Sequence, residues 1–334
     1  KDLNFLNKVG VKQLALFARQ FAAMLRAGVA IVNSLDILRQ QTENKKMRAT
    51  IGQMYEDVQK GFAFSEAMGR HPDVFPNLMV SMVAAGEASG NLDGVSSRMA
   101  LHYEKEFKVN NRVKSAMVYP IILVVASVLI VGFLIGFVMP TFIGMFESSG
   151  VPLPGPTRLL MSMARVLRGY WYLFILGIGA FLYAFRRYSQ MPDGRWRIDG
   201  FKLRAPLLKG LTNKANSSRF TRTLATLLSS GIPLLEAMDN VAGAVGNVVV
   251  AHAIMQAKED VRKGSALSTP IRRSGMFPPM VDSMMKIGEE SGALDEILDK
   301  TADFFDEEVE TEVQRLLTFM EPMMIVIMAR SEER

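Results

Sequence analysis

The chain has 334 residues, of which 49% are hydrophobic, with a formal net charge of +6 and no cysteine. The lack of cysteine excludes disulfide frameworks and thiolate zinc sites, and the modest positive charge comes without the Lys/Arg run or aromatic motif of a nucleic-acid surface. The apolar content is high for a soluble protein and favours a membrane protein with sizeable polar parts.

The first third of the chain predicts a bundle of amphipathic helices. Apolar residues at helical spacing, followed by helix-ending signals, predict helices over 11–27, 31–42 and 46–60. Ser65 is placed to cap a short fourth helix, and Pro76 is placed to open a fifth. No stretch alternates with the period of two that strands show, so we expect an all-α protein.

A long basic helix then leads into an uncharged stretch. Residues 121–139 are apolar or small, which is about the length needed to cross the hydrocarbon of a bilayer. Pro120 is placed to kink this helix at its entry, and Pro140 is placed to end it. The pattern Gly132-x-x-x-Gly136 either lets a second membrane helix pack closely or reflects only the glycine content of an apolar helix.

A second uncharged run, 169–185, follows a short proline-containing link that is too small for a domain. Aromatic residues flank this run and two arginines follow it, as at a membrane interface, so we predict a returning span. Positive charges gather before the first span and after the second. Because positive loops stay in the cytoplasm, both helical bundles are predicted to be cytoplasmic and the link external.

The pattern G-E-x-S-G-x-L-D occurs twice, at 86–93 and at 288–295. The likeness extends over most of both halves, at an offset of 203 that becomes 202 after one residue is lost before Phe277. We therefore predict a tandem duplication with about six helices in each copy. A third apolar run, 323–329, is too short to cross a bilayer, so we predict an incomplete third span. The chain also begins without methionine or signal peptide, and we interpret it as a fragment.

This organisation divides the chain into eight parts. The predicted parts are a first cytoplasmic helical bundle with its stem helix (1–115), membrane helix 1 (116–140), a short external link (141–168), membrane helix 2 (169–185), a basic connector (186–216), a second cytoplasmic bundle with its stem helix (217–317), the start of a truncated membrane helix 3 (318–329) and a charged tail (330–334).

The duplicated pattern supplies the main candidate site. In one interpretation it is a corner between helices, in which glycine allows positive φ while serine and aspartate satisfy helix-end amides. In another, its glutamates contact a partner protein or a second protomer, and a third interpretation makes them oxygen ligands for a cation. The candidate residues are Gly86, Glu87, Ser89, Gly90 and Asp93, with Gly288, Glu289, Ser291, Gly292 and Asp295.

Two further features allow alternative interpretations. Arg19 and Arg222 occupy matching positions on the first helix of each copy, where each either pairs with a carboxylate of its own bundle or faces another molecule. The two stem helices differ in the sign of their charge. Either both present solvated faces, or they lie side by side within or between protomers, with Lys108 and Arg112 opposite Glu308 and Glu312.

Together, two G-E-x-S-G-x-L-D copies, two F-x-R-x-x-A-x-x-L-x-x-G helices and the Tyr119-Pro120 and Glu321-Pro322 steps resemble the GspF/PilC family. These are inner-membrane platform proteins of type II secretion and type IV pilus machines. The resemblance covers the chain from about Leu14 to Ala329.

The resemblance implies a multi-pass, homo-oligomeric scaffold in the bacterial inner membrane. Its bundles would contact an assembly ATPase, or also a retraction ATPase, and other inner-membrane alignment proteins. Its membrane helices would face the lipid bilayer and the pilins or pseudopilins. Glu321 stands where the first copy has Tyr119, so its carboxylate could reach the interface and contact a pilin.

No P-loop, H-E-x-x-H, G-x-S-x-G or calcium-loop pattern occurs, and the three histidines lack metal-ligand spacing. We therefore expect no enzymatic activity, no cofactor and no metal. The alternative function is a membrane subunit of a transporter or permease. That alternative, like an intramembrane enzyme, requires ionisable groups inside the spans, and neither 121–139 nor 169–185 contains one.

Overall fold

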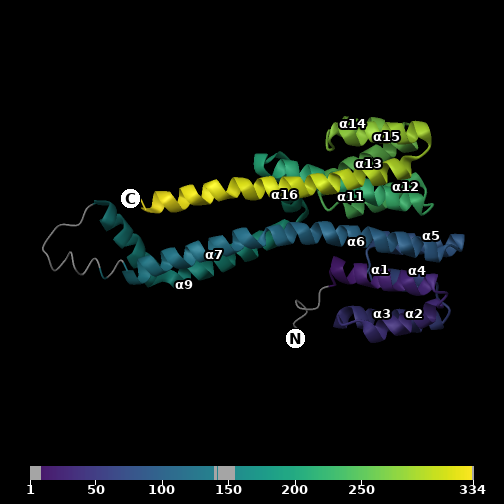
Figure 1. Cartoon of the computed structure of the whole chain (residues 1–334), viewed down its shortest axis with the longest axis horizontal. Coiled ribbons are helices and arrows are strands. Elements are labelled where there is room, and N and C mark those ends of the chain that lie inside the picture. The colour runs from purple at the N-terminus through teal and green to yellow at the C-terminus, as the bar shows by residue number, and fades with distance from the viewer. Residues whose placement is uncertain (1–8, 139–140, 142–154, 333–334) are drawn as a thin grey trace. The chain divides into compact units, whose positions relative to one another are not determined.

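The computed structural model describes residues 9–138, 141 and 155–332, and the regular elements of that part are all helices (Figure 1). The first set comprises α1 (Val11–Arg26), α2 (Ile31–Gln41), α3 (Lys45–Gln59), α4 (Phe64–Gly69), α5 (Asn77–Ser89) and α6 (Leu92–Ala116). The elements that follow are α7 (Val118–Phe133), the π-helical turn η1 (Leu134–Val138), α9 (Gly155–Gln190) and α10 (Pro192–Arg204). The second set comprises α11 (Pro206–Ser229), α12 (Leu234–Ala244), α13 (Val248–Arg262), α14 (Ser268–Ser274), α15 (Pro279–Ser291) and α16 (Leu294–Glu332).

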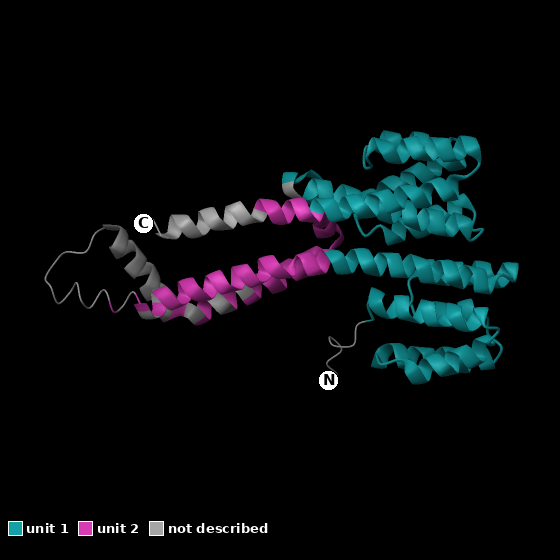
Figure 2. Ribbon diagram, viewed as in Figure 1, with its two compact units in different colours: residues 1–112, 202–312 teal, residues 113–201, 313–334 magenta. Residues whose placement is uncertain are grey.

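The chain divides into two compact units (Figure 2). Unit 1 contains residues 1–112 and 202–312, and unit 2 contains 113–201 and 313–334. Unit 1 therefore includes the short helices of both sets. The two bundles, which the sequence predicts as separate parts, belong to one compact unit, and ion pairs between the sets supply a physical reason that is described below.

Helix ends in unit 1 follow the pattern expected from sequence. Gly28 and Gly61, just after α1 and α3, have φ of +78° and +94°. Their counterparts at an offset of 203, Gly231 and Gly264, have φ of +82° and +95°. Since a side chain is strained in this left-handed conformation, glycine at these places ends each helix at low cost.

The core of unit 1 is built from aromatic and aliphatic side chains on the inner faces of the helices. The ring centroids of Phe17 and Phe75 are 5.2 Å apart. The corresponding pair in the second set, Phe220 and Phe277, is 4.6 Å apart. The same contact between the first helix and the segment before the fifth thus recurs in both sets.

Unit 2 contains the most apolar helix of the described chain. The helical stretch Leu92–Phe133, which joins α6 to α7, is the one helix of the described residues that is long and apolar enough to cross a membrane by length and composition. Its regular backbone is interrupted at Met117, close to Pro120, which has no N–H to continue the helical hydrogen bonds. Ile121, Leu129 and other apolar side chains of α7 are exposed.

The segment predicted as a second span, 169–185, lies inside α9. This helix begins at Gly155, within the predicted link, and departs from helical geometry at Tyr170, where φ is −124° and ψ is 19°. Pro140, predicted to end the first span, and residues 142–154 of the predicted link lie outside the described residues.

Two boundaries differ from the sequence prediction. The basic connector predicted over 186–216 is largely helical, because α9 continues to Gln190 and α10 and α11 follow. Helix α11 begins at Pro206, whose fixed φ suits the first turn of a helix, so the second set starts earlier than 217. In the predicted start of the third span, α16 continues through Pro322 to Glu332 without a break.

Candidate functional site

Each copy of the duplicated pattern forms a turn between two helices of unit 1. Gly90 follows α5 with a φ of +69°, and Gly292 follows α15 with a φ of +70°. The amide of the next residue returns to the helix, from Asn91 to the carbonyl of Gly86 over 3.0 Å, and from Ala293 to that of Gly288 over 3.1 Å. Both turns therefore end a helix by a left-handed glycine and satisfy its last carbonyls.

Glu87 points away from this turn toward the start of the short helix α4. Its Oε1 accepts a hydrogen bond from the amide of Phe64 at 2.7 Å, and its Oε2 accepts one from the amide of Ser65 at 3.0 Å. The hydroxyl of Ser65 also donates to Oε2. A carboxylate is well suited to this position, since the N-terminus of a helix carries free amides and partial positive charge.

Glu289 makes the same arrangement with α14. The amide of Leu267 donates to its Oε1, and Ser268 donates to its Oε2 from the hydroxyl at 2.6 Å and from the amide at 3.3 Å. Both oxygens of each glutamate are therefore occupied by donors from within unit 1. The geometry favours a structural role over ligation of a cation, because each carboxylate accepts three hydrogen bonds from the start of a helix, which leaves about one of its four lone pairs.

Sequence reasoning missed the partner of each glutamate, because it makes Ser65 the cap of α4. That interpretation is wrong, because α4 begins at Phe64 and Ser65 donates its hydroxyl to Glu87. The signal was present, since the Ser–Glu pair recurs as Ser268 and Glu289. The charged carboxylate satisfies more of the free amides than a single hydroxyl can.

The remaining residues of the pattern act locally. Ser89 donates its hydroxyl to the carbonyl of Ala85 at 2.7 Å, and the hydroxyl of Ser291 lies 3.4 Å from the carbonyl of Gly288. Asp93 lies inside the first turn of α6 rather than at its cap, because that helix begins at Leu92. Asp295 occupies the same place in α16. Both carboxylates lie at the N-terminus of the helix that follows, where negative charge interacts favourably with the helix dipole.

Gly86 and Gly288 allow the two helices of each turn to come close. A Cβ atom on Gly86 would stand 3.1 Å from Leu92 Cδ1 and 3.2 Å from Leu92 Cα. On Gly288 it would stand 2.9 Å from Leu294 Cα, which real Cβ contacts do not reach. Glycine is therefore required here by the close approach of neighbouring backbone.

We expect Glu289→Gln to lower the free energy of unfolding by roughly 2 kcal/mol, since hydrogen bonds to a charged acceptor contribute about 1.5–3 kcal/mol and the amide of glutamine would face donors. Glu87→Gln should act in the same direction. The measurement is thermal unfolding of the detergent-solubilised chain. Glu290→Gln is the control, because Glu290 is exposed and its contact with Lys286 is 3.7 Å long. Equal melting of the Glu289 and Glu290 variants would contradict the capping role.

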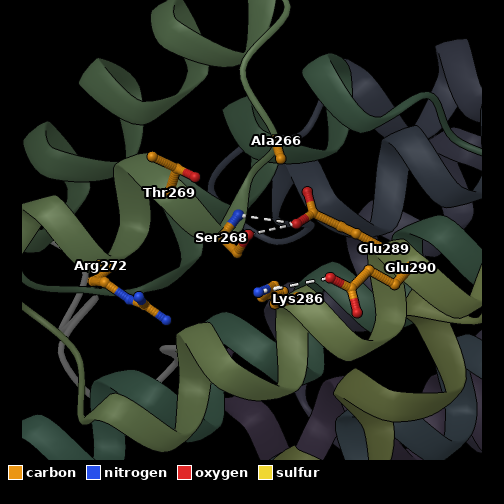
Figure 3. A pocket seen from close by; sticks show the side chains of 7 residues that line it. All are labelled: Ala266, Ser268, Thr269, Arg272, Lys286, Glu289 and Glu290. Atoms are coloured by element: carbon orange, nitrogen blue, oxygen red, sulfur yellow. Dashed lines mark hydrogen bonds and ion pairs between the residues drawn. The ribbon is translucent and has the colours of Figure 1, made fainter.

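A pocket of about 380 Å³ adjoins the second turn (Figure 3). Its lining comes from α14, from Ala266 before that helix and from α15, and comprises Ala266, Ser268, Thr269, Arg272, Lys286, Glu289 and Glu290. Arg272 Nε donates to Asp282 at 2.5 Å, and Ser268 donates to Glu289. Of its lining, the first set repeats at the matching positions only the alanine, the serine and the glutamate.

Arg222, on α11, lies in an unusually acidic setting. Its guanidinium contacts three carboxylates of α16, those of Asp299 and Asp303 at 2.6 Å and that of Asp306 at 2.7 Å. The side chain of Arg222 is 6% exposed, whereas those of Asp299 and Asp303 are about half exposed. The cation therefore lies inside the unit while two of its partners keep contact with water.

The pKa of Asp303 is held below its usual value. Burial by itself raises this pKa, but hydrogen bonds from Lys105 and Arg222 outweigh it. Lys105 Nζ, on α6, stands 2.7 Å from Asp303 Oδ1. The aspartate is therefore ionised at neutral pH and joins a cation of the first set to one of the second.

Arg19 is placed differently from its counterpart. It lies exposed on α1, and among the described residues no carboxylate stands within ion-pair distance of it. The carboxylates that surround Arg222 correspond in the first set to Ser97, Leu101 and Glu104. Arg222 thus forms ion pairs inside unit 1, whereas the side chain of Arg19 is exposed to solvent.

The two stem helices, α6 and α16, lie within ion-pair reach of each other in unit 1. Besides Lys105 with Asp303, Arg112 stands 2.5 Å from Glu310. The predicted pairing of Lys108 with Glu308 or Glu312 is not found, because each of these residues has another partner. Lys108 contacts Glu104 of its own helix. The acids proposed as its partners, Glu308 and Glu312, both lie 2.6 Å from Lys214 of α11, which occupies them because α11 begins before residue 217.

A buried histidine completes the contact between α6 and α11. His102 Nδ1 stands 3.1 Å from the hydroxyl of Thr226, which in turn donates to the carbonyl of Arg222. Burial, with the positive charge of Arg222, lowers the pKa of His102 to about 4. The imidazole is therefore neutral at pH 7 and acts as a packed polar contact. No sequence signal distinguished it from the other two histidines.

The residues predicted at the membrane are not brought to this site. Gly132 and Gly136 lie in α7 and η1, and no described atom beyond their own helix backbone and chain neighbours would lie within 4 Å of a Cβ on either. Pro120 lies at the start of α7. Glu321 and Pro322 belong to α16, and their side chains lie outside the described part.

Comparison with known proteins gives a consistent result. Residues 17–140 and 220–329 match the family described as Type II secretion system (T2SS), protein F. The chain is 42% identical over 320 residues to Type IV pilus assembly protein PilC of Thermus thermophilus, covering 96% of this chain and 79% of the relative.

The similar proteins include both type IV pilus assembly proteins and type II secretion system proteins F. Identity to Type IV pilus assembly protein PilC of Pseudomonas aeruginosa is 34% over 322 residues, covering 96% of this chain and 86% of the relative. Identity to Type II secretion system protein F of Vibrio cholerae is also 34%, over 325 residues, covering 97% and 80% respectively.

Proposed function

Because this chain belongs to the family of type II secretion system protein F, we propose that it is the inner-membrane platform of a filament-assembly machine. In this role it couples a cytoplasmic assembly ATPase to the insertion or removal of pilins or pseudopilins. The observation that carries the proposal is the 42% identity to a type IV pilus assembly protein across 96% of the chain. The machine is a type IV pilus or a type II secretion system.

The proposed architecture is a tandem duplication held in the membrane by three spans. One support is the constant offset of 203 or 202 between matching residues. Another is the similar positive φ of Gly28 and Gly231, and of Gly90 and Gly292. The family match in two separate stretches agrees with it. The exposed apolar surface of α7 supports one crossing, and the uncharged run at 169–185 supports a second.

The proposed role is mechanical rather than catalytic. In unit 1, ion pairs of Lys105 and Arg112 with α16 connect the two stem helices. A displacement that a motor causes in one set of helices is therefore transmitted to the other set through these ion pairs. Each stem helix continues beyond unit 1, α6 toward α7 and α16 toward Glu332, so a shift of the stems is a means of acting on pilins in the membrane.

Affinity capture of the tagged full chain from native membranes, followed by mass spectrometry, tests this function. We expect an assembly ATPase and pilin-like proteins to be recovered together. The transporter alternative predicts recovery of a solute-binding protein or a nucleotide-hydrolysing permease subunit instead. That result, or capture of neither ATPase nor pilin under mild detergent, would contradict the platform role.

A further inference from the structure

A cationic hollow lies between α2 and α3, in the first set of helices. Its volume is about 550 Å³, and its lining comprises Arg39, Gln40, Lys45, Arg48, Ala49 and Gly52. Three of these six side chains are cations and none is an acid. Gln40, Lys45, Arg48 and Ala49 are exposed, so the hollow is shallow and open to solvent.

The two arginines of the hollow are each held in place by contacts with neighbouring residues of the first set. Arg39 contacts Asp36 at 2.6 Å, and its guanidinium carbon lies 5.1 Å from the centre of the Tyr55 ring. Arg48 donates from Nε to the carbonyl of Thr42 at 2.7 Å. These contacts order both side chains, and the bond from Nε leaves the two terminal nitrogens of Arg48 available as a fork for a carboxylate.

Two of the three cations have no acidic partner. Within the described part of the chain, no carboxylate lies within ion-pair distance of Lys45 or Arg48. Like charges brought together without a counter-charge repel one another, and this repulsion does not stabilise the fold. An anionic partner would remove it.

The second set of helices supplies an internal control. Asn44 and Asn247 correspond at the offset of 203, and each caps the third helix of its set, Asn44 through the amide of Met47 and Asn247 through that of Val249, both at 3.0 Å. Both turns thus end in an asparagine cap, although Gly246 has a φ of +77° where the first set has Glu43. The lining positions carry no acid, lysine or arginine in the second set, where they are Ala242, Gly243, Val248, Ala251, His252 and Met255. The fold therefore does not require the three cations.

We propose that this α2–α3 hollow docks an acidic segment of a protein partner, with at least two Asp or Glu side chains. Arg48 would hold one carboxylate through its fork and Lys45 another, while Ala49 and Gly52 leave room for the backbone of the segment. An open, shallow surface suits an extended peptide better than a small ion, which needs an enclosing site. The inference goes beyond the proposed function, because such binding does not depend on which machine the chain serves.

Fluorescence anisotropy with the full chain in detergent tests the inference. The probe is a labelled peptide of four Glu-Gly repeats, and the comparison peptide has glutamine in place of glutamate. We expect the glutamate peptide to bind and the glutamine peptide not to bind. Lys45→Glu with Arg48→Glu should weaken binding at least tenfold, since rim charges govern such recognition.

The control variant, Arg262→Glu with Lys263→Glu, makes the same change of net charge on the second set and should alter binding less than twofold. Both pairs of residues are exposed, and glutamate at position 45 lies in the first turn of α3, where it suits the helix. Arg262→Glu removes an exposed ion pair with Glu259 in the last turn of α13, so the control should be slightly less stable than the parent chain, and binding is compared at a temperature at which thermal unfolding shows both variants folded. Equal weakening by the two variants, no binding by the parent, or displacement of the peptide by millimolar inorganic phosphate at constant ionic strength would overturn the proposal.

Discussion

Replacing Arg222 by methionine is expected to lower the free energy of unfolding by about 3 kcal/mol, the lower end of the cost of breaking a buried ion pair. The variant removes a cation that is 6% exposed and leaves the carboxylates of Asp299, Asp303 and Asp306 close together. We choose the lower end because two of these carboxylates are about half exposed and can regain water. Thermal unfolding in detergent should show a loss of several degrees.

Arg19→Met is the matched control, because Arg19 occupies the corresponding position and is exposed. Its effect should be within about 0.5 kcal/mol, as for most surface changes. Asp306→Asn in the Arg222→Met background should recover part of the loss, since it removes the most buried of the three stranded charges. If both arginine variants melt alike, the acidic setting of Arg222 does not contribute to stability as described.

Replacing Gly288 by valine is expected to cost about 3 kcal/mol, at the upper end for overpacking of a well-packed interior. The Cβ atom alone would stand 2.9 Å from Leu294 Cα, so α15 and α16 would have to separate at the turn. Backbone cannot give way as the end of a flexible side chain can. The loss would appear in thermal unfolding, and Gly86→Val should act in the same direction.

Gly243→Val controls for the helix itself. Beyond its own helix backbone and its chain neighbours, no described atom lies within 4 Å of a Cβ placed on Gly243, which is in α12, so valine there should be nearly neutral or slightly stabilising. A Gly288→Val chain as stable as the parent would mean that the two helices of the turn are not held as closely as the structure indicates.

The helices of unit 1 could be predicted because their signals are local. The spacing of apolar residues and the glycines after α1 and α3 predicted both helices to within a residue or two at each end. The roles of Glu87 and Glu289 could not be predicted in this way. Each acts on a helix that begins more than twenty residues earlier in the chain, and only the packed fold brings the two together.

The difference between Arg19 and Arg222 also depends on residues far along the chain. The two arginines share the same local motif, so local patterns treat them as equal. What separates them is the stem helix, which offers three aspartates to Arg222 and only one acid, Glu104, at the positions matching those for Arg19. The asymmetry is visible in the sequence only when the two stems are aligned position by position, because no local motif contains both the arginine and its acids.

The ion pairs between the stem helices α6 and α16 could be predicted only in part from charge. The opposite signs of α6 and α16 left pairing as one of two alternatives. The structure shows ion pairs between the two helices, but the charges did not indicate which acid meets which base. Lys214 takes Glu308 and Glu312, because α11 starts earlier than its sequence suggested. Charge thus predicts that two helices attract, while the partners depend on where a third helix begins.

The proposed function requires a membrane-held platform that presents both sets of helices to a cytoplasmic motor. Because these 334 residues contain no cysteine, an introduced cysteine is the one thiol among them, and labelling can be measured on the tagged chain after it is purified from the cells. Lys60→Cys and Lys263→Cys mark exposed, corresponding sites of the two sets, and Ser148→Cys marks the predicted external link.

With a membrane-impermeant maleimide, we expect Ser148→Cys to be labelled in intact cells, and the two lysine variants to be labelled only after the inner membrane is permeabilised. Labelling of either Lys60→Cys or Lys263→Cys in intact cells would place that set of helices outside the cytoplasm and contradict the platform role.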